Sequence, residues 1–292
     1  MAIAGGVESM TRAPFVMGKA EKAFQRNTEI FDTTIGWRFV NTRMKDLYGV
    51  DSMPETGENV AVDYQVSRED QDAFALRSQQ RAAKAQAAGF FARHISAISV
   101  PGPKGAPATV FDKDEQIRAD SSIEALARLK PVVKTGGTVT AGNASSINDG
   151  SAALLLASWN AVEKYSLQPR ARVLGVASAG VPPRVMGMGP VPAVQKLLAR
   201  HKLKVSDLSV IELNEAFASQ SLACLRGLGL ADDAEHVNPN GGAIALGHPL
   251  GMSGARIAGF AMQELVDRGG RYALATMCVG VGQGAALLIE RI

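Results

Sequence analysis

The pattern of apolar and polar residues changes near residue 150, and from there it predicts regular structure. Short runs that are apolar throughout alternate with longer segments in which an apolar residue returns every three or four positions. The first kind indicates buried strands, and the second indicates helices that turn one face to a core. Strands are therefore expected at 170–179, 208–213, 271–277 and 285–292, and helices at 191–201, 215–228 and 253–269. This alternation predicts an α/β sheet covered by helices on both faces, with the last two strands forming a hairpin.

Before residue 150 the pattern is weaker. Residues 2–4 indicate a strand that enters a turn at Gly5-Gly6, and residues 11–66 show no clear period, which is typical of a functional loop region. The clearest helix follows, because Ser67 is a suitable N-cap, strong helix formers come after it, and Gly89 is a suitable end. Two further elements are expected, a strand at 94–100 and a short helix at 121–129.

Composition and charge narrow the class of protein. Of the 292 residues, 46% are hydrophobic and 20% are charged, and the mean hydropathy is +0.03, as in ordinary globular proteins. The net charge of +3 is too balanced for nucleic-acid binding, and no apolar run is long enough to cross a membrane. Two cysteines are too few for a disulfide scaffold and indicate a reducing compartment, so a cytoplasmic protein is expected. The four histidines and two cysteines share no metal-ligand spacing, so no metal site is expected.

Two motifs place reactive side chains beside turns of the backbone. Asn214 follows the apolar run 208–213 and begins a helix, and ligands of α/β sheets bind at the carboxyl ends of such strands. A plain helix cap is an equally good interpretation of Asn214. His248 lies in a Gly-rich turn, where imidazole could act as a base near neutral pH. The alternative is a buried histidine with satisfied hydrogen bonds, although the many glycines favour a backbone that approaches a ligand.

Cys278 begins another Gly-rich segment, which runs to Gly284. A thiol at the end of a strand could be a nucleophile or a proton carrier, and a small buried core residue is the other interpretation. The segment is not a dinucleotide fingerprint, because a strand and not a helix follows it. Residues 138–150 contain many small polar groups, which could bind an extended ligand with amide or phosphate groups or could simply form a capped turn.

Together, these motifs resemble those of the thiolases, which are acetyl-CoA acyltransferases. Four segments match in family order and with family-like separations, namely Ala4-Gly-Gly-Val-Glu-Ser-Met10, Asn214-Glu-Ala-Phe-Ala218, Asn240-Gly-Gly-Ala-Ile-Ala-Leu-Gly-His-Pro249 and Cys278-Val-Gly-Val-Gly-Gln-Gly284. Residues 31–39 and 51–56 further resemble the 3-oxoadipyl-CoA (β-ketoadipyl-CoA) thiolases of bacterial aromatic degradation.

The resemblance implies the layered α/β/α/β/α architecture of thiolases, which is built from two similar half-domains. Residues 1–160 would be the remainder of the N-terminal half, with a loop domain at about 12–142, and residues 166–292 would be the C-terminal half. In that family the nucleophilic cysteine and the opening βαβ elements precede the first matching segment. We therefore expect both to be absent from this chain, through a start codon assigned too late or a partial gene.

The resemblance also implies a reaction, the CoA-dependent thiolytic cleavage of 3-oxoadipyl-CoA to succinyl-CoA and acetyl-CoA. His248 would activate the nucleophile, and Cys278 would protonate the leaving acetyl-CoA carbanion and deprotonate the incoming CoA. Asn214 would hold a water that forms an oxyanion hole with His248, and the Gly280 amide would contribute to a second one. Fixed donors aimed at the developing negative charge are the physical requirement of such a reaction.

CoA is then a co-substrate, and no prosthetic group is expected. By the same resemblance, Arg118 would lie near the adenine of CoA, and Ser145 and Phe217 would lie along the pantetheine. Met53 and Met186 would line the acyl pocket.

Several alternatives stay open. A chain without its nucleophile is expected to be inactive, and a non-catalytic thiolase-like protein that binds CoA or acyl-CoA is the second candidate. A decarboxylating condensing enzyme is disfavoured, because Cys278 stands where those relatives have histidine or asparagine. Arg38 or Arg43 could pair with the terminal carboxylate of a dicarboxylic acyl chain, or both could be solvated loop charges. Thiolases form dimers and tetramers, so a homo-oligomer is expected for the full-length form.

Overall fold

The structure is a computed structural model that describes residues 1–292. Up to residue 164 its elements, including the 3₁₀ helices labelled η, are β1 (Ala2–Glu8), η1 (Met10–Arg12), β2 (Phe15–Met17), β3 (Ile30–Asp32), α1 (Thr42–Tyr48), α2 (Met53–Asp63), α3 (Arg68–Ala87), η2 (Phe91–Arg93), β4 (Ile98–Val100), β5 (Thr109–Phe111), α4 (Ile123–Ala127), β6 (Gly150–Leu156) and α5 (Trp159–Lys164). The later elements are β7 (Ala171–Gly180), η3 (Pro183–Met188), α6 (Pro190–His201), η4 (Val205–Asp207), β8 (Leu208–Leu213), α7 (Ala218–Gly227), α8 (Ala243–Leu246), α9 (Leu250–Asp267), β9 (Tyr272–Val279) and β10 (Gln283–Arg291).

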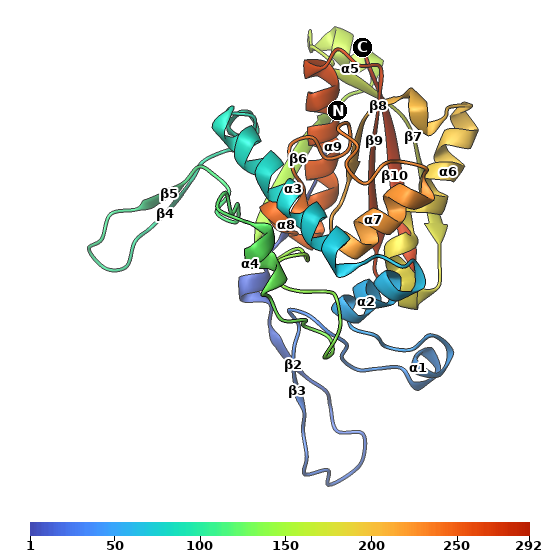
Figure 1. Cartoon of the computed structure of the whole chain (residues 1–292). Coiled ribbons are helices and arrows are strands. Elements are labelled where there is room, and N and C mark those ends of the chain that lie inside the picture. The colour runs from blue at the N-terminus through green and yellow to red at the C-terminus, as the bar shows by residue number, and fades with distance from the viewer.

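The later strands form one four-stranded sheet in the order β7-β10-β9-β8. Strands β8 and β9 are parallel, so their carboxyl ends lie at the same edge, and the other two pairs are antiparallel. Side chains alternate between the faces of a strand. Accordingly, Ile211 of β8 packs with α6 and α7 on one face, and Val210 packs with α9 on the other. Figure 1 shows these helices on either side of the sheet, which confirms the predicted covering and the terminal hairpin.

Helix α9 lies between this sheet and a smaller one. The smaller sheet pairs β1 with β6 in antiparallel register, and α9 contacts both of its strands. The turn predicted at Gly5-Gly6 is wrong, because β1 continues through both glycines to Glu8. The glycines serve close packing instead, since a Cβ on Gly6 would collide with the carbonyl oxygen of Gly251 in α9. The successive layers are α6 with α7, the four-stranded sheet, α9, and the two-stranded sheet.

Part of the segment predicted as an irregular loop is helical. Helix α2 occupies Met53–Asp63, within residues 11–66. The main-chain N–H of Ser52 donates to the Glu55 carboxylate at 2.6 Å, so Ser52-Met-Pro-Glu55 begins the helix in the manner of a capping box. The prediction of helix 121–129 is confirmed in a shorter form by α4, whereas the strand predicted at 94–100 is limited to Ile98–Val100. The first residues of that segment instead follow the 3₁₀ turn η2.

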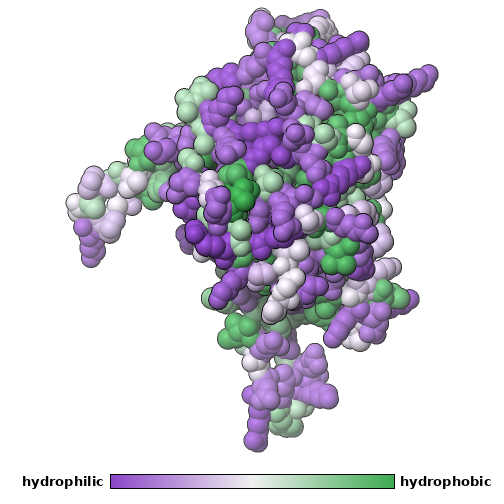
Figure 2. Space-filling model, in the orientation of Figure 1, coloured by the Kyte–Doolittle hydropathy of each residue, from purple (hydrophilic) through white to green (hydrophobic).

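Two hairpins project from the body of the molecule. Strands β2 and β3 form one arm, and β4 and β5 form the other (Figure 1). Figure 2 shows apolar side chains along both arms, mixed with polar ones. None of the helices is both long enough and apolar enough to cross a membrane.

Candidate active site

His248 and Asn214 come together although 34 residues separate them in the sequence. His248 lies in the turn between α8 and α9, and Asn214 follows directly on β8. The Asn214 main-chain N–H donates to the carbonyl of Thr276 in β9 at 3.0 Å, which fixes Asn214 at the carboxyl edge of the sheet. Its side-chain Nδ2 lies 3.3 Å from Nε2 of His248. The carboxamide of Asn214 and the imidazole of His248 therefore lie within hydrogen-bond range of each other.

The carbonyl oxygen of the Asn214 side chain has no hydrogen-bond partner, although the residue is only 1% exposed. A buried amide oxygen without a partner costs free energy, so such atoms are usually satisfied by water or ligand. This orphaned acceptor fits the expectation that Asn214 holds a water beside His248.

Cys278 lies at the end of β9, the strand next to β8. It belongs to a small apolar cluster that also contains Phe217 and Met186, and Met53 packs against this cluster from outside. Cys278 lies one residue before the end of strand β9 at Val279, and Phe217 follows the end of the neighbouring parallel strand β8, which explains why they meet. Met53 and Met186, predicted for the acyl pocket, and Phe217, predicted for the pantetheine, thus share one apolar cluster with the predicted acid/base thiol, whereas Ser145 is not part of it.

Burial changes the protonation of both groups. Desolvation, aided by the positive charge of Arg256, lowers the pKa of His248 from 6.5 to about 4. Desolvation raises the pKa of the Cys278 thiol from 9.0 to about 12. Near neutral pH the imidazole is therefore an uncharged potential proton acceptor, and the thiol is an uncharged potential proton donor.

The polar segment 138–148 runs past both of these groups. The Ser145 main-chain N–H donates to the carbonyl of Ala216 at 3.0 Å, and Ala144 forms a β-bridge with Phe217. The His248 main-chain N–H in turn donates to Asn148 Oδ1 at 3.2 Å. The segment was predicted either to bind ligand or to be a capped turn, and the structure places it along the edge of the candidate site.

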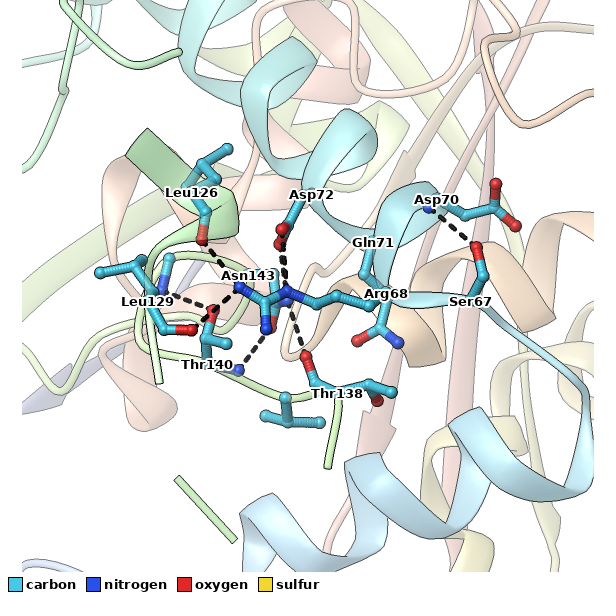
Figure 3. A network of polar contacts seen from close by, with 12 residues as sticks. Ser67, Arg68, Asp70, Gln71, Asp72, Leu126, Leu129, Thr138, Thr140 and Asn143 are labelled. Carbon is cyan, nitrogen blue, oxygen red and sulfur yellow. Dashed lines mark hydrogen bonds and ion pairs between the residues drawn. The ribbon is translucent and has the colours of Figure 1, made fainter. Parts of the chain in front are cut away.

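A buried polar network anchors this segment to helix α3 (Figure 3). Asn143 Nδ2 donates to Asp72 Oδ1 at 3.0 Å, and Asn143 Oδ1 accepts from the Thr140 main-chain N–H at 2.8 Å. The other oxygen of Asp72 pairs with Arg68 Nε at 2.8 Å. Asn143 and Asp72 are 0% and 3% exposed, so the network is shielded from water.

Two of the predicted site residues, Arg118 and Gly280, make none of the contacts described for His248, Asn214 and Cys278. Arg118 is exposed, its guanidinium forms no salt bridge, and its main-chain N–H is held by Gln79 of α3 at 2.7 Å. Gly280 lies in the turn between β9 and β10, where its carbonyl accepts from Gln283 Nε2 at 3.1 Å. The site that a Cβ on Gly280 would occupy is open, with no atom within 4 Å. Their predicted roles stay predictions.

Three residues that support the site were not singled out from the sequence. The buried carboxylate of Glu215 accepts from Ser78 Oγ at 2.7 Å and from Asn238 Nδ2 at 2.9 Å, directly beside Asn214. Desolvation raises the pKa of Glu215. Asn148 and Ser253 contact His248 itself. Glu215 and Asn148 lie within recognised motifs, but only the fold shows which atoms they bind.

Cys224 lies in the middle of α7 and does not join the site. Its thiol is fully buried and donates to the carbonyl of Gly187 at 3.2 Å, and burial raises its pKa from 9.0 to about 12. No group of three or more His, Cys, Asp or Glu residues could hold a metal ion.

Two family models match nearly the whole chain. The family model described as the thiolase N-terminal domain matches residues 1–160, and that of the thiolase C-terminal domain matches residues 167–291. A beta-ketoadipyl-CoA thiolase of Pseudomonas aeruginosa is 68% identical over 292 residues, which are 100% of this chain and 72% of that protein. The 3-oxoadipyl-CoA/3-oxo-5,6-dehydrosuberyl-CoA thiolase of Escherichia coli K12 is 60% identical, over 99% of this chain and 72% of that protein.

The fold of this chain is also similar to those of solved structures. The Bacillus anthracis acetyl-CoA acetyltransferase matches with a TM-score of 0.90 and 40% identity, over 99% of this chain and 71% of the other. Human mitochondrial 3-ketoacyl-CoA thiolase in complex with CoA matches with a TM-score of 0.88 and 40% identity, over 99% of this chain and 70% of the other. The predicted fold and the predicted resemblance are both confirmed.

Proposed function

Because this chain belongs to the thiolase family, we propose that it carries the proton-transfer and oxyanion groups for thiolytic cleavage of a 3-oxoacyl-CoA. The observation that carries this proposal is the 3.3 Å approach of Asn214 Nδ2 to His248 Nε2, at the end of the strand next to the one that bears Cys278. The proposal requires that Cys278, at the end of the neighbouring strand, reaches the same thioester as His248 and Asn214.

In the proposed reaction a thiolate attacks the 3-keto carbon of the substrate, and the bond between C2 and C3 breaks. His248 Nε2 takes the proton of the attacking thiol. The neutral thiol of Cys278 protonates the acetyl-CoA carbanion, which leaves as acetyl-CoA. Cys278, now a thiolate, takes the proton of incoming CoA, whose sulfur attacks the acyl thioester. The bond from the acyl group to the first nucleophile breaks, and that nucleophile leaves as a thiolate that regains its proton from His248. Asn214 and the Gly280 amide contribute to stabilising the developing oxyanions.

We propose 3-oxoadipyl-CoA as the substrate, with succinyl-CoA and acetyl-CoA as products. Support comes from the names of relatives that are 68% and 60% identical to this chain. Such an acyl chain ends in a carboxylate, and a cation could bind it. Arg38 and Arg43 are both exposed, and neither forms a salt bridge within the chain. Arg38→Ala should weaken binding of succinyl-CoA more than binding of acetyl-CoA, whereas equal weakening would count against this assignment.

The nucleophile of the first step is not evident among the two cysteines of this chain. Cys224 is buried and donates a hydrogen bond to the Gly187 carbonyl, and Cys278 is the residue that we assign as the acid/base. We therefore propose that residues 1–292 alone have no thiolytic turnover. The test is an assay of the purified chain with acetoacetyl-CoA and 3-oxoadipyl-CoA. Turnover well above that of a Cys278→Ser control would refute the proposal of inactivity.

The second candidate function is CoA or acyl-CoA binding without exchange. It is favoured by the same lack of a free nucleophile, because the segment with Ser145 and the cluster with Phe217, Met53 and Met186 are intact. Calorimetry with CoA would detect binding where the assay detects no product. Arg118→Ala should weaken CoA binding several-fold if Arg118 lies near the adenine, whereas Arg128→Ala, another exposed arginine, should not.

We further propose that CoA is a co-substrate with no prosthetic group beside it, and that the protein works in the cytoplasm. The free thiols of Cys224 and Cys278 support a reducing compartment. We also propose that the protein forms a homo-oligomer.

A further inference from the structure

The imidazole of His248 has hydrogen-bond partners on both ring nitrogens. Nδ1 lies 2.7 Å from the hydroxyl of Ser253, which is 0% exposed in the first turns of α9. That hydroxyl also lies 2.8 Å from the carbonyl of Pro249, one helical turn earlier. A serine hydroxyl has a single proton, so when it donates to Pro249 it can only accept from His248. Nδ1 must then carry the imidazole proton.

The opposite nitrogen, Nε2, consequently holds the lone pair. It faces Asn214 Nδ2, a donor, at 3.3 Å. The two contacts agree, because one partner requires a proton on Nδ1 and the other requires a lone pair on Nε2. This is the tautomer in which the atom that faces the site can accept a proton.

The backbone of His248 is held as tightly as its ring. Asn148 Oδ1 accepts from the His248 main-chain N–H at 3.2 Å and from Ser146 Oγ at 2.8 Å. Gly247 has φ of +85°, and a Cβ there would collide with the Asn148 carboxamide. Arg256 Nη2 donates to the Gly247 carbonyl at 2.9 Å. The turn therefore fits only with glycine at 247 and a short polar side chain at 148.

We propose that Ser253 and Asn148 are positioning residues that hold His248 as its Nδ1–H tautomer, with the Nε2 lone pair directed at Asn214. Ser253 selects the tautomer, and Asn148 fixes the turn that presents the ring. The inference rests on the proposed function only in that the lone pair is then the base for the attacking thiol. Arg256, the charged group near the ring, and burial both favour the neutral imidazole that the proposal requires.

The direct test is nitrogen NMR of the chain labelled with ¹⁵N-histidine, because long-range proton–nitrogen correlations distinguish the two tautomers. His248→Gln identifies the His248 signals among those of the four histidines. The unaltered chain should show a protonated Nδ1 and an unprotonated Nε2. Ser253→Ala should lower the ratio of Nδ1–H to Nε2–H tautomers roughly five-fold, the effect of about one hydrogen bond.

Ser221→Ala is the matched control. Ser221 is also a buried serine within a helix, but its hydroxyl has no hydrogen-bond partner, so the tautomer ratio should stay unchanged. The His248 main-chain N–H also donates to the Ser146 carbonyl at 3.3 Å, so Asn148→Ala, which removes one of two acceptors, should increase hydrogen exchange at this amide roughly three-fold. Asn240→Ala, at a site bonded to Glu264, should not have this effect.

A dominant Nε2–H tautomer in the unaltered chain overturns the proposal, and it does so even if Ser253→Ala fails to fold. An unchanged ratio in a folded Ser253→Ala chain overturns it as well. Neither measurement needs turnover. A chain that shows the expected tautomer but binds no CoA thioester would contradict the proposed function and leave this inference intact.

Discussion

His248 is half-buried and Cys278 is buried, and this loss of contact with water shifts the pKa of each side chain. Desolvation lowers the pKa of the imidazole to about 4 and raises that of the thiol to about 12. A charged imidazole could not take a proton, and a thiolate could not give one. Burial thus keeps both side chains uncharged near neutral pH, and it makes the imidazole a weaker base and the thiol a weaker acid than they are in water.

The same shift makes the stability of the fold depend on pH. The folded-state pKa of His248 lies below the 6.5 of an ordinary histidine, so between these values the unfolded chain binds more protons. Stability must therefore fall as the pH decreases. From about pH 7 to about pH 5, His248 alone should reduce the free energy of unfolding by about 2 kcal/mol. Urea unfolding at both pH values measures this loss.

His248→Gln provides the comparison, because glutamine does not titrate. Burial also lowers the pKa values of His94 and His236, so some loss of stability at acidic pH should persist in the variant. The loss should nevertheless be smaller than in the unaltered chain. Equal losses in both proteins would show that His248 is not the buried neutral group described here.

Some residues of this site can be predicted from the sequence, and others become evident only in the fold. Asn214, His248 and Cys278 could be predicted as candidates because each stands at a strand end or in a Gly-rich turn, which are local features. Ser253 and Asn148 were not found, because their importance lies in hydrogen bonds to a histidine in another segment or turn. A buried hydrogen bond between elements has no local pattern, so only the fold shows it.

At the scale of elements, the segment 138–148 connects the site to two helices. Glu58 of α2 accepts from the main-chain N–H groups of Thr138 and Val139, at 2.9 and 3.0 Å. Asp72 of α3 binds Asn143 further along. A polar segment with few apolar contacts would otherwise be mobile, so these buried carboxylates give it the fixed shape that a ligand-binding edge needs.

Asn143→Ala removes only a few side-chain atoms, but it should lower the free energy of unfolding strongly. It removes hydrogen bonds to Asp72 and Thr138 and leaves a buried N–H of Thr140 without a partner. The expected loss is about 2–4 kcal/mol in the free energy of unfolding, with faster hydrogen exchange in residues 138–148. Urea unfolding and mass-spectrometric exchange measure the two effects.

The control for this prediction is Asn240→Ala. Asn240 is half-buried and makes one side-chain hydrogen bond, to Glu264 at 2.8 Å, so the loss should stay near 1 kcal/mol or below. Similar losses of unfolding free energy for both variants would mean that the Asp72 network does not stabilise residues 138–148 more than a single hydrogen bond would.

Elements differ in how well their patterns predict them. The four strands and three helices predicted from residue 170 onward lie close to the observed ones, because each buries a face of regular period, whereas the short helix α8 was not predicted. Helix α2 was missed, since its capping-box signal at Ser52 and Glu55 was overlooked within an irregular stretch. The continuation of β1 through Gly5-Gly6 depends on contact with α9, which no local pattern contains.

At the scale of the whole molecule, the two sheets differ in how well they are covered. The four-stranded sheet has helices on both faces, whereas the β1–β6 sheet has α9 on one face only. Ile3 and Leu155 are paired across β1 and β6 on the other face, and they are 79% and 61% exposed. Val7, on the same face of β1, is 70% exposed. Such an exposed apolar face favours association.

We therefore expect this chain to self-associate through the exposed β1–β6 face. Analytical ultracentrifugation should show a species larger than the 30.7 kDa monomer at micromolar concentration. Ile3→Lys places a charge at the centre of the contact and should raise the dissociation constant roughly ten-fold or more. Val110→Lys is the matched control, because Val110 is a 59% exposed strand residue on the β4–β5 arm. A monomeric unaltered chain, or dissociation caused by Val110→Lys and not by Ile3→Lys, would contradict the role assigned to this face.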